Sequence, residues 1–174
     1  MGLLSDNEWS KSYDNLVMSQ PPIIYESSKT FSGFPCAHRK WRHKGHCAFV
    51  HGYSRSFTIW FGAHKRSENG FVMDFGDLKE IQAWLNECFD HTLLLDKDDP
   101  LLPHFEDLEK LGGCKLFVMD DCSMEGTAKM IFDHVDPWVE QKTEGRVWVQ
   151  SVEARENVKN SGRIRRASPP PPQG

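Results

Sequence analysis

Hydrophobic positions along the first half of the chain follow a strand period and then a helix period. The stretch from Ser54 to Gly62 is rich in aromatic and β-branched residues, and the alternation of Phe57, Ile59 and Phe61 within it predicts a long strand. A turn at Asn69-Gly70 then leads into a short apolar strand, Phe71-Val72-Met73. Asp74 has the side chain of an N-cap, and the apolar residues after it recur at helical spacing as far as about Phe89. This half therefore predicts two strands followed by a helix.

The second half repeats the alternation after a loop-rich stretch from Asp96 to Gly113, which holds a short helix around Phe105 to Leu111. A short buried strand is predicted over Leu116–Met119, and a final strand over Arg146–Val152. Between them, a helix led by Glu125 has one apolar face, although Pro137 disfavours its last turn. The apolar face is formed by Ala128, Ile131, Val135 and Trp138.

These elements predict an α+β domain with an antiparallel four-stranded sheet and two helices on one face. We place it at residues 23–156, after a flexible N-terminal arm, 1–22, that ends in prolines. Residues 157–174 have few apolar side chains and a basic, proline-rich composition, so a disordered tail is expected. The open edges of such a sheet favour oligomerisation.

Composition and charge exclude several classes of protein. The 174 residues, 39% of them hydrophobic, suit one domain, and the net charge of -4 argues against a general nucleic-acid binder. No apolar run approaches the roughly 20 residues that cross a bilayer, and the first residues do not resemble a secretory signal. Five cysteines without a CxxC pair suggest reduced thiols. We therefore expect a cytoplasmic protein that binds neither membrane nor nucleic acid.

Four histidines fall within 14 residues, at His38, His43, His46 and His51, and form a candidate metal site. An exposed basic loop with incidental histidines explains this segment equally well. Cys47 lies among them, and a thiol near a metal or an imidazolium becomes a usable base or nucleophile. The alternative for Cys47 is a small buried hydrophobic residue.

An ordered set of short motifs resembles one known family. The set comprises Phe31–Arg39, Cys47–Tyr53, Gly70–Phe75 and Phe89-Asp90-His91, followed by Glu125 at the start of the second helix. In this order the motifs resemble the 6-pyruvoyl- and 6-carboxy-tetrahydropterin synthases, over roughly residues 29–155. The resemblance implies the tunnelling fold (T-fold), in which subunits assemble as a dimer of trimers into a barrel. It further implies a homohexamer with active sites between subunits.

The resemblance also implies a zinc-dependent lyase acting on a pterin, 7,8-dihydroneopterin triphosphate, with loss of triphosphate. Zinc would act as a Lewis acid on the side-chain hydroxyls, Cys47 as general base, and Asp90 with His91 as proton relay. The products would be 6-pyruvoyl or 6-carboxy pterins. The three residues between Cys47 and His51 resemble the carboxy branch, which feeds queuosine-type 7-deazaguanine synthesis.

Substrate-binding carboxylates are also implied by the resemblance. Glu153 is the best match for the acid that hydrogen-bonds the pterin, with Glu156 as second choice. Glu125 matches the glutamate of the second helix, where its charge would equally well complement the helix dipole.

The chain departs from the family pattern at the third zinc ligand. The family has His-Gly-His, whereas this chain has His51-Gly52-Tyr53. With His38 and His51 as two ligands, either His46 or His43 supplies the third, or Tyr53 occupies the site and the metal is weak or absent. We favour His46, because it directly precedes Cys47.

Two other functions remain open from the sequence. The chain could be a pterin- or purine-binding T-fold protein that has an altered metal site and no catalytic activity, as Tyr53 suggests. It could also be an enzyme of the same fold whose long 96–113 segment admits a different substrate.

Overall fold

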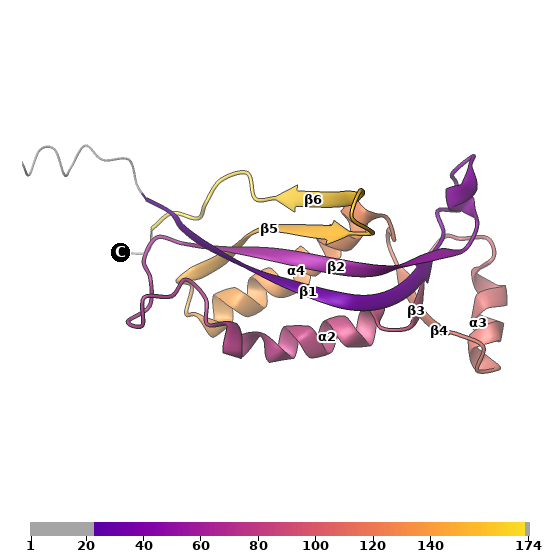
Figure 1. Ribbon diagram of the computed structural model, residues 1–174, viewed down its shortest axis with the longest axis horizontal. Helices are drawn as coiled ribbons and strands as arrows, with labels where there is room; N and C mark the ends of the chain where they lie inside the picture. Colours follow the sequence, from indigo (N-terminus) through magenta and orange to yellow (C-terminus); the bar gives the residue numbers. More distant parts are fainter. Residues whose placement is uncertain (1–22, 173–174) are drawn as a thin grey trace, which may run out of the picture.

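The computed structural model describes residues 23–172 and contains one six-stranded sheet in the order β4-β3-β1-β2-β5-β6 (Figure 1). The expected arm, residues 1–22, lies outside the described residues. The strands are β1 (Tyr25–His38), β2 (His51–Ala63), β3 (Thr92–Asp96), β4 (Lys115–Met119), β5 (Val147–Arg155) and β6 (Ser161–Arg165). The helices are α2 (Lys79–Phe89), α3 (Leu102–Lys110) and α4 (Met124–Lys142), with 3-10 turns η1 (His46–Ala48) and η2 (Phe75–Leu78).

Most elements predicted from hydrophobic periodicity are confirmed. The strand expected over residues 54–62 lies within β2, and the helix expected after Asp74 is formed by η2 and α2. Asp74 is an N-cap, and its side chain accepts a hydrogen bond from the Gly76 backbone N–H at 2.8 Å. The second helix extends through Pro137 to Lys142 as α4.

The prediction of four antiparallel strands is corrected to six strands in a mixed sheet. The strands β1, β3 and β6 were not predicted from the sequence. In β3 all five residues are buried, and such a short continuous apolar run has no alternation. β1 pairs in parallel with β3, and β3 in parallel with β4. The β3–β4 connection passes through α3, as a parallel pair requires a crossover.

The short strand predicted over Phe71–Met73 is absent from the structure. The Ser67 N–H donates to the Phe71 carbonyl at 2.8 Å, so the turn closes on itself. The Arg146 guanidinium then donates to the Phe71 and Val72 carbonyls. These contacts occupy the backbone groups that a sheet ladder would use.

The prediction of a disordered tail is corrected for residues 161–165, which form β6 against β5. Gly162 is buried, and a Cβ there would lie 2.7 Å from the backbone N of Glu125, so only glycine allows this approach to α4. Beyond β6, Arg166 forms an ion pair with Asp136. His64 Nε2 hydrogen-bonds the Pro170 carbonyl oxygen at 2.8 Å. This segment docks through backbone pairing and charge, so it needs few apolar residues. Its composition therefore resembled that of a disordered tail.

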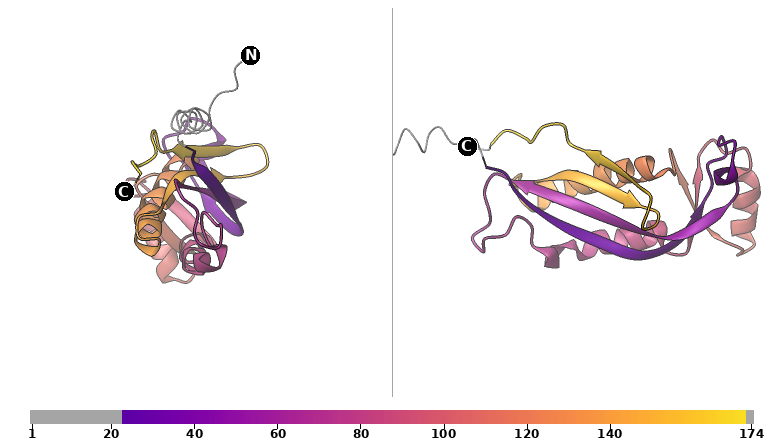
Figure 2. Two further views of the ribbon diagram at one scale, coloured as in Figure 1. Left: turned by 90° about the vertical axis from the view of Figure 1, so that its left-hand side faces the viewer. Right: turned by 45° about the horizontal axis from the view of Figure 1, so that its top comes forward.

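Both long helices, α2 and α4, cover one face of the sheet, as expected, and the hydrophobic core lies between these layers (Figure 2). Phe57 packs against Phe34 and Phe89, with ring centroids 5.2 and 4.6 Å away. A β-bulge between Ser32 and Phe34, where Gly33 has φ +88°, shifts the register of β1. The bulge brings Phe31 and Phe34 to the same buried face.

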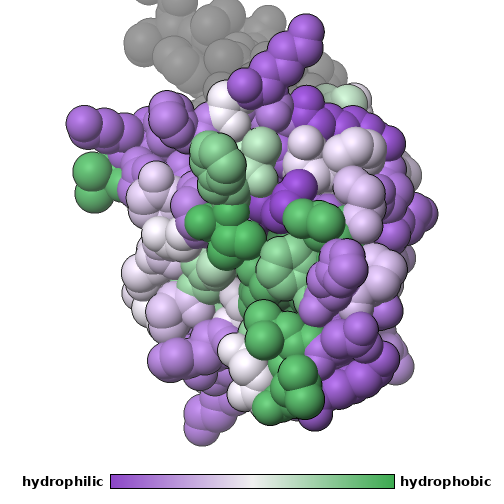
Figure 3. Space-filling view, turned by 90° about the vertical axis from the view of Figure 1, so that its right-hand side faces the viewer, coloured by the Kyte–Doolittle hydropathy of each residue, from purple (hydrophilic) through white to green (hydrophobic). Residues whose placement is uncertain are grey.

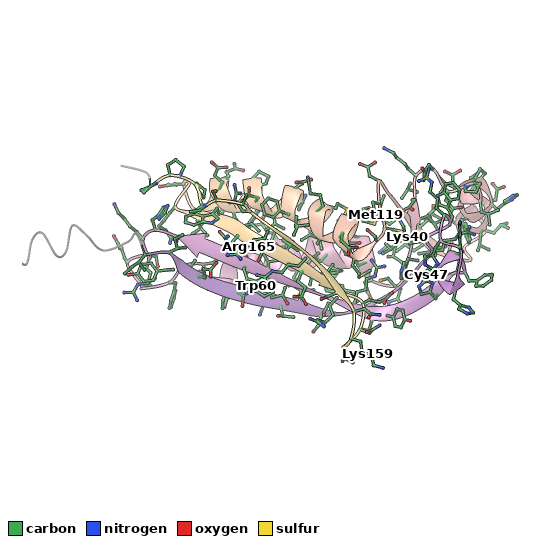
Figure 4. The ribbon with its side chains drawn as sticks, turned by 90° about the horizontal axis from the view of Figure 1, so that it is seen from above. Lys40, Cys47, Trp60, Met119, Lys159 and Arg165 are labelled. Carbon is green, nitrogen blue, oxygen red and sulfur yellow. The ribbon has the colours of Figure 1, made fainter. Side chains whose placement is uncertain are left out.

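Beyond the helices, β1 and β2 continue to one end of the molecule, where they meet β3, β4, α3 and η1 (Figures 1 and 4). This end carries His38, His51 and the loop between them, which includes Cys47. Among residues 23–172, no helix combines the length and apolarity that crossing a bilayer demands.

Candidate metal centre and active site

The last residue of β1 and the first residue of β2 form a pair of facing histidines. His38 and His51 are directly opposite in the antiparallel ladder, so their side chains lie on the same face of the sheet. Their ring centroids are 4.3 Å apart. The two histidines proposed from sequence as metal ligands are therefore adjacent in space.

Both imidazoles are prepared to offer a lone pair. Burial, and then the positive charge of Arg55, lower the pKa of His38 to about 3, so its ring is neutral at pH 7. The Nδ1 atom of His51 hydrogen-bonds the Phe49 carbonyl oxygen at 2.7 Å, which favours the tautomer with the proton on Nδ1 and the lone pair on Nε2. Metal-binding histidines are commonly oriented by such a backbone carbonyl.

Glu156, just after β5, completes the group. Its Oε1 lies 3.6 Å from His38 Nε2 and 4.0 Å from His51 Nε2, and its side chain is 14% exposed. One donor atom from each of the three residues lies within 4.8 Å of the others. The group contains two imidazoles and one carboxylate, a donor set that zinc accepts.

The spacing and the unsatisfied atoms of this group fit a small cation. Two ligands of a tetrahedral zinc ion lie roughly 3.4 Å apart, given metal–ligand distances near 2.1 Å. At 3.6 Å the His38–Glu156 pair is too long for a hydrogen bond, and the buried Nδ1 of His38 has no partner. The donor atoms lie within 4.8 Å of one another, so the residues present fit zinc with a contraction of about 1.4 Å or less.

A fully buried arginine lies behind the histidines. Arg55 donates to Thr127 Oγ1 at 3.2 Å and to the Cys122 carbonyl at 3.4 Å, while its Nε has no partner. Burial lowers the pKa of Arg55, and Cys36, Cys122 and Glu156 oppose this shift. Its positive charge disfavours protonation of the neighbouring His38.

His46, the expected third ligand, lies outside this group. It is exposed in η1, whose single turn directs residues 46 and 47 outward, and Glu156 takes the third place beside His38 and His51. His43 is also exposed, and its Nδ1 accepts a hydrogen bond from the Gly45 N–H at 2.9 Å. The sequence could not place Glu156 here, because it is 105 positions from His51.

Cys47 is exposed, so the interpretation as a small buried hydrophobic residue is wrong. Its loop is tied to β1, because the Lys40 N–H donates to the Cys47 carbonyl at 2.8 Å. The Lys40 ammonium contacts Asp96 and Asp121, each at 2.7 Å. Figure 4 shows Lys40 and Cys47 at the same end of the molecule.

Asp90 and His91 form the predicted pair at the end of α2. Asp90 Oδ1 lies 2.8 Å from His91 Nδ1, and His91 has φ +53°, the bent backbone that a contact between neighbours requires. The His91 N–H donates to the Pro35 carbonyl at 2.8 Å, and its side chain is exposed. This fixed geometry suits a carboxylate that orients an imidazole.

Tyr53 follows His51 on β2 but opens onto a different space. Its ring is edge-on to His51 with centroids 6.0 Å apart, and the residue is 42% exposed. Tyr53 and His91 together line a shallow groove over the β1–β3 junction. Tyr53 lies between this groove and the histidine–glutamate group. Its ring lines the groove and is also edge-on to His51.

The remaining predicted carboxylates lie apart from this group. Glu153 pairs with Thr58 in the β2–β5 ladder and forms an ion pair with Arg155. Glu125 is exposed in the first turn of α4, where it complements the helix dipole, and faces another groove beside Asp121. Glu156 is thus the one of the three that the structure brings to the histidines.

An apolar stripe crosses the surface at this end of the molecule (Figure 3). Large hydrophobic residues are exposed in and beside η1, α3 and β4 at this end: Phe49, Val50, Leu101, Leu108, Leu111 and Val118. Helix α3 contributes no buried residue to the core of the chain. Such a patch marks an interaction surface.

Comparisons with known proteins agree with this fold. The sequence profile described as 6-pyruvoyl tetrahydropterin synthase matches residues 27–167. The chain is 31% identical over 134 residues to 6-carboxy-5,6,7,8-tetrahydropterin synthase of Aquifex aeolicus, covering 67% of this chain and 82% of that protein. The corresponding protein of Rickettsia conorii is 33% identical over 103 residues, 59% of this chain and 71% of the other.

Two solved structures share the fold. An uncharacterized protein from Wolinella succinogenes has a TM-score of 0.70 and 23% identity, over 82% of this chain and 98% of that one. The 6-pyruvoyl tetrahydropterin synthase of Plasmodium vivax has a TM-score of 0.63 and 17% identity, over 83% and 98%. The profile match over most of the chain, together with the Aquifex relative, shows that this protein belongs to the 6-pyruvoyl tetrahydropterin synthase family.

Proposed function

We propose that the protein is a zinc-dependent lyase that converts 7,8-dihydroneopterin triphosphate into a 6-carboxy-tetrahydropterin, with loss of triphosphate and of the two outer side-chain carbons as a two-carbon aldehyde. The observation that carries this proposal is the convergence of His38, His51 and Glu156 into one donor group. The names of the Aquifex and Rickettsia relatives support the 6-carboxy branch over the 6-pyruvoyl branch. Such a product would enter 7-deazaguanine synthesis.

His38 and His51 would hold the zinc ion, each through a neutral ring nitrogen. When bound, zinc supplies Lewis-acid polarisation of the substrate's side-chain hydroxyls. The chain prepares these ligands in two ways: Arg55 and burial keep His38 neutral, and the Phe49 carbonyl fixes the tautomer of His51.

Cys47 and the Asp90–His91 pair would move the protons. The Cys47 thiolate accepts a proton from the substrate side chain and becomes a thiol, while His91, held by Asp90, exchanges the second proton. The exposure of Cys47 and the 2.8 Å contact between Asp90 and His91 support these roles. Glu153 would hydrogen-bond the pterin ring, and Glu125 would assist at the start of α4.

The site would be completed between subunits of a homohexamer, a dimer of trimers. Two observations support an assembly: Cys47 and His91 are outside the donor group of their own chain, and an apolar stripe is exposed at this same end. All five cysteines are unpaired, which supports a reducing compartment such as the cytoplasm.

The test is to supply zinc-loaded protein with 7,8-dihydroneopterin triphosphate and to identify the products by mass spectrometry. We expect a 6-carboxy product that disappears in Cys47→Ala and persists in Lys44→Ala, an exposed residue of the same loop. A 6-pyruvoyl product would assign the protein to the other branch.

The rival function is a pterin- or purine-binding protein without catalytic activity. It predicts that the zinc-loaded wild-type protein binds the pterin and returns it unchanged. That result, with one zinc ion per chain, would contradict the proposed activity.

A further inference from the structure

We propose that Glu156 is the third metal ligand of this chain and has replaced the side chain at position 53 in that role. The inference rests on the proposed binding of zinc and concerns how the chain itself completes the site. It explains how His51-Gly52-Tyr53 can remain part of a metal centre.

The Glu156 carboxylate is held in place by the turn that follows β5. Its Oε2 accepts hydrogen bonds from the amides of Asn157 at 3.3 Å and Asn160 at 3.2 Å. The Glu156 backbone N–H also donates to the Asn160 carbonyl at 3.1 Å. One oxygen is therefore occupied by the turn, and the other, Oε1, is the atom that faces both histidines.

The two donors that contact Oε2 act as positioning groups. Metal-binding carboxylates are usually hydrogen-bonded in this way, which fixes their orientation before the metal arrives. The β5–β6 turn exists because β6 pairs with β5, so the strand that sequence periodicity missed also supports the site.

Tyr53 is arranged for another role. The pairing of β1 and β2 places Tyr53 opposite Cys36, two pairs further along than His38 and His51. Its ring is 42% exposed and lines the groove that contains His91. A phenol is not among the usual zinc ligands, whereas a carboxylate is.

The experiment exchanges the ligand between the two positions. Zinc affinity of the full chain is measured by competition with a chromogenic chelator, and zinc content by atomic emission after dialysis. We expect Glu156→Ala to weaken zinc binding at least about 100-fold. Tyr53→His alone should leave one zinc ion per chain, and Glu156→Ala with Tyr53→His should recover most of the affinity.

The matched control is Glu153→Ala, which removes a carboxylate of the same element that is paired with Arg155 instead of the histidines. Zinc affinity should be unchanged in this variant. Glu156→Gln keeps the size and the amide contacts of the turn, so a loss of zinc in Gln and Ala variants with wild-type circular dichroism assigns the effect to the ligand oxygen.

The outcomes separate this inference from the proposed function. Wild-type zinc affinity in Glu156→Ala overturns the inference and leaves zinc dependence standing. Failure of Tyr53→His to restore binding overturns the exchange between the two positions. A wild-type protein that binds no zinc contradicts the proposed function itself.

Discussion

His38 and His51 face each other across the first pair of the β1–β2 ladder, with ring centroids 4.3 Å apart. The register that pairs them is fixed by the buried face of the hairpin, where Phe57 opposes Phe31. A slip of one residue would move a whole strand's side chains to the opposite face. The metal centre is therefore specified by the same pattern that builds the core.

The first prediction concerns which histidines bind zinc. His38→Ala and His51→Ala should each reduce zinc from one ion per chain to well below it, because each removes one of three donors. His46→Ala should retain the wild-type content, because His46 is exposed in η1. Atomic emission after gel filtration measures all three. Loss of zinc in His46→Ala alone would instead support the ligand favoured by sequence.

The second prediction concerns the ion pairs that tie the Cys47 loop to the sheet. Lys40→Met should lower the free energy of unfolding by about 2–4 kcal/mol, because the Asp96 carboxylate, 6% exposed, loses its cation. The matched control is Lys97→Met. Lys97 pairs with the exposed Asp120, so its loss should leave the free energy of unfolding nearly unchanged.

Urea denaturation at fixed protein concentration measures both lysine variants. Equal denaturation midpoints for Lys40→Met and Lys97→Met would contradict the prediction that Lys40 stabilises the fold by neutralising the buried Asp96 carboxylate. Alkylation of Cys47 should also be faster in Lys40→Met, because loss of the ammonium contacts with Asp96 and Asp121 loosens the loop that carries Cys47.

The third prediction concerns thiol reactivity and its pH dependence. In the folded protein iodoacetamide should modify Cys47 at pH 8, and leave Cys36, Cys88 and Cys122 unmodified because they are buried. Burial, followed by the charge of Glu87, raises the pKa of Cys88 to about 11. Since the thiolate reacts, labelling of Cys88 should increase only as the pH rises toward 11.

Mass spectrometry of tryptic peptides identifies the labelled sites. Cys47→Ser should remove the fast phase, and unfolding in urea should make all five thiols reactive. Rapid labelling of Cys88 at pH 8 would contradict its burial in α2.

How far the sequence determined this structure differs between elements. The helix after Asp74 and the strand around Phe57 were predictable, because each has one apolar face and a clear period. β3 was not, because its buried residues lack alternation, and β6 was not, because it docks through Gly162 and backbone pairing. The long strand β1 was not predicted either, and all three missed strands pair with partners that only the structure identifies.

The residues of the candidate site also differ in how far the sequence alone could identify them. His38, His51 and the Asp90–His91 pair could be identified, because each belongs to a short local motif. The position of Glu156 could not, because it depends on the pairing of β2 with β5 and on the turn that leads into β6. Glu153 and Glu156 are three residues apart, and only the structure distinguishes which one meets the histidines.

The last prediction tests β6 and its contact with α4. Gly162→Ala should lower the free energy of unfolding by about 1–3 kcal/mol, because the added Cβ would lie 2.7 Å from the Glu125 backbone N and 2.8 Å from Met124. Ser161→Ala, at the exposed neighbouring position, is the control and should change stability by less than about 0.5 kcal/mol.

If β6 supports the Glu156 turn, Gly162→Ala should also weaken zinc binding, about 10-fold, while leaving the three donors in place. Hydrogen exchange measured by mass spectrometry should show faster exchange in residues 161–165 and unchanged exchange in β2. The backbone of α4 at Met124 and Glu125 cannot move aside as a flexible side chain would, so an added Cβ must disturb the contact. Wild-type stability and exchange in Gly162→Ala would therefore contradict the docking of β6 on α4.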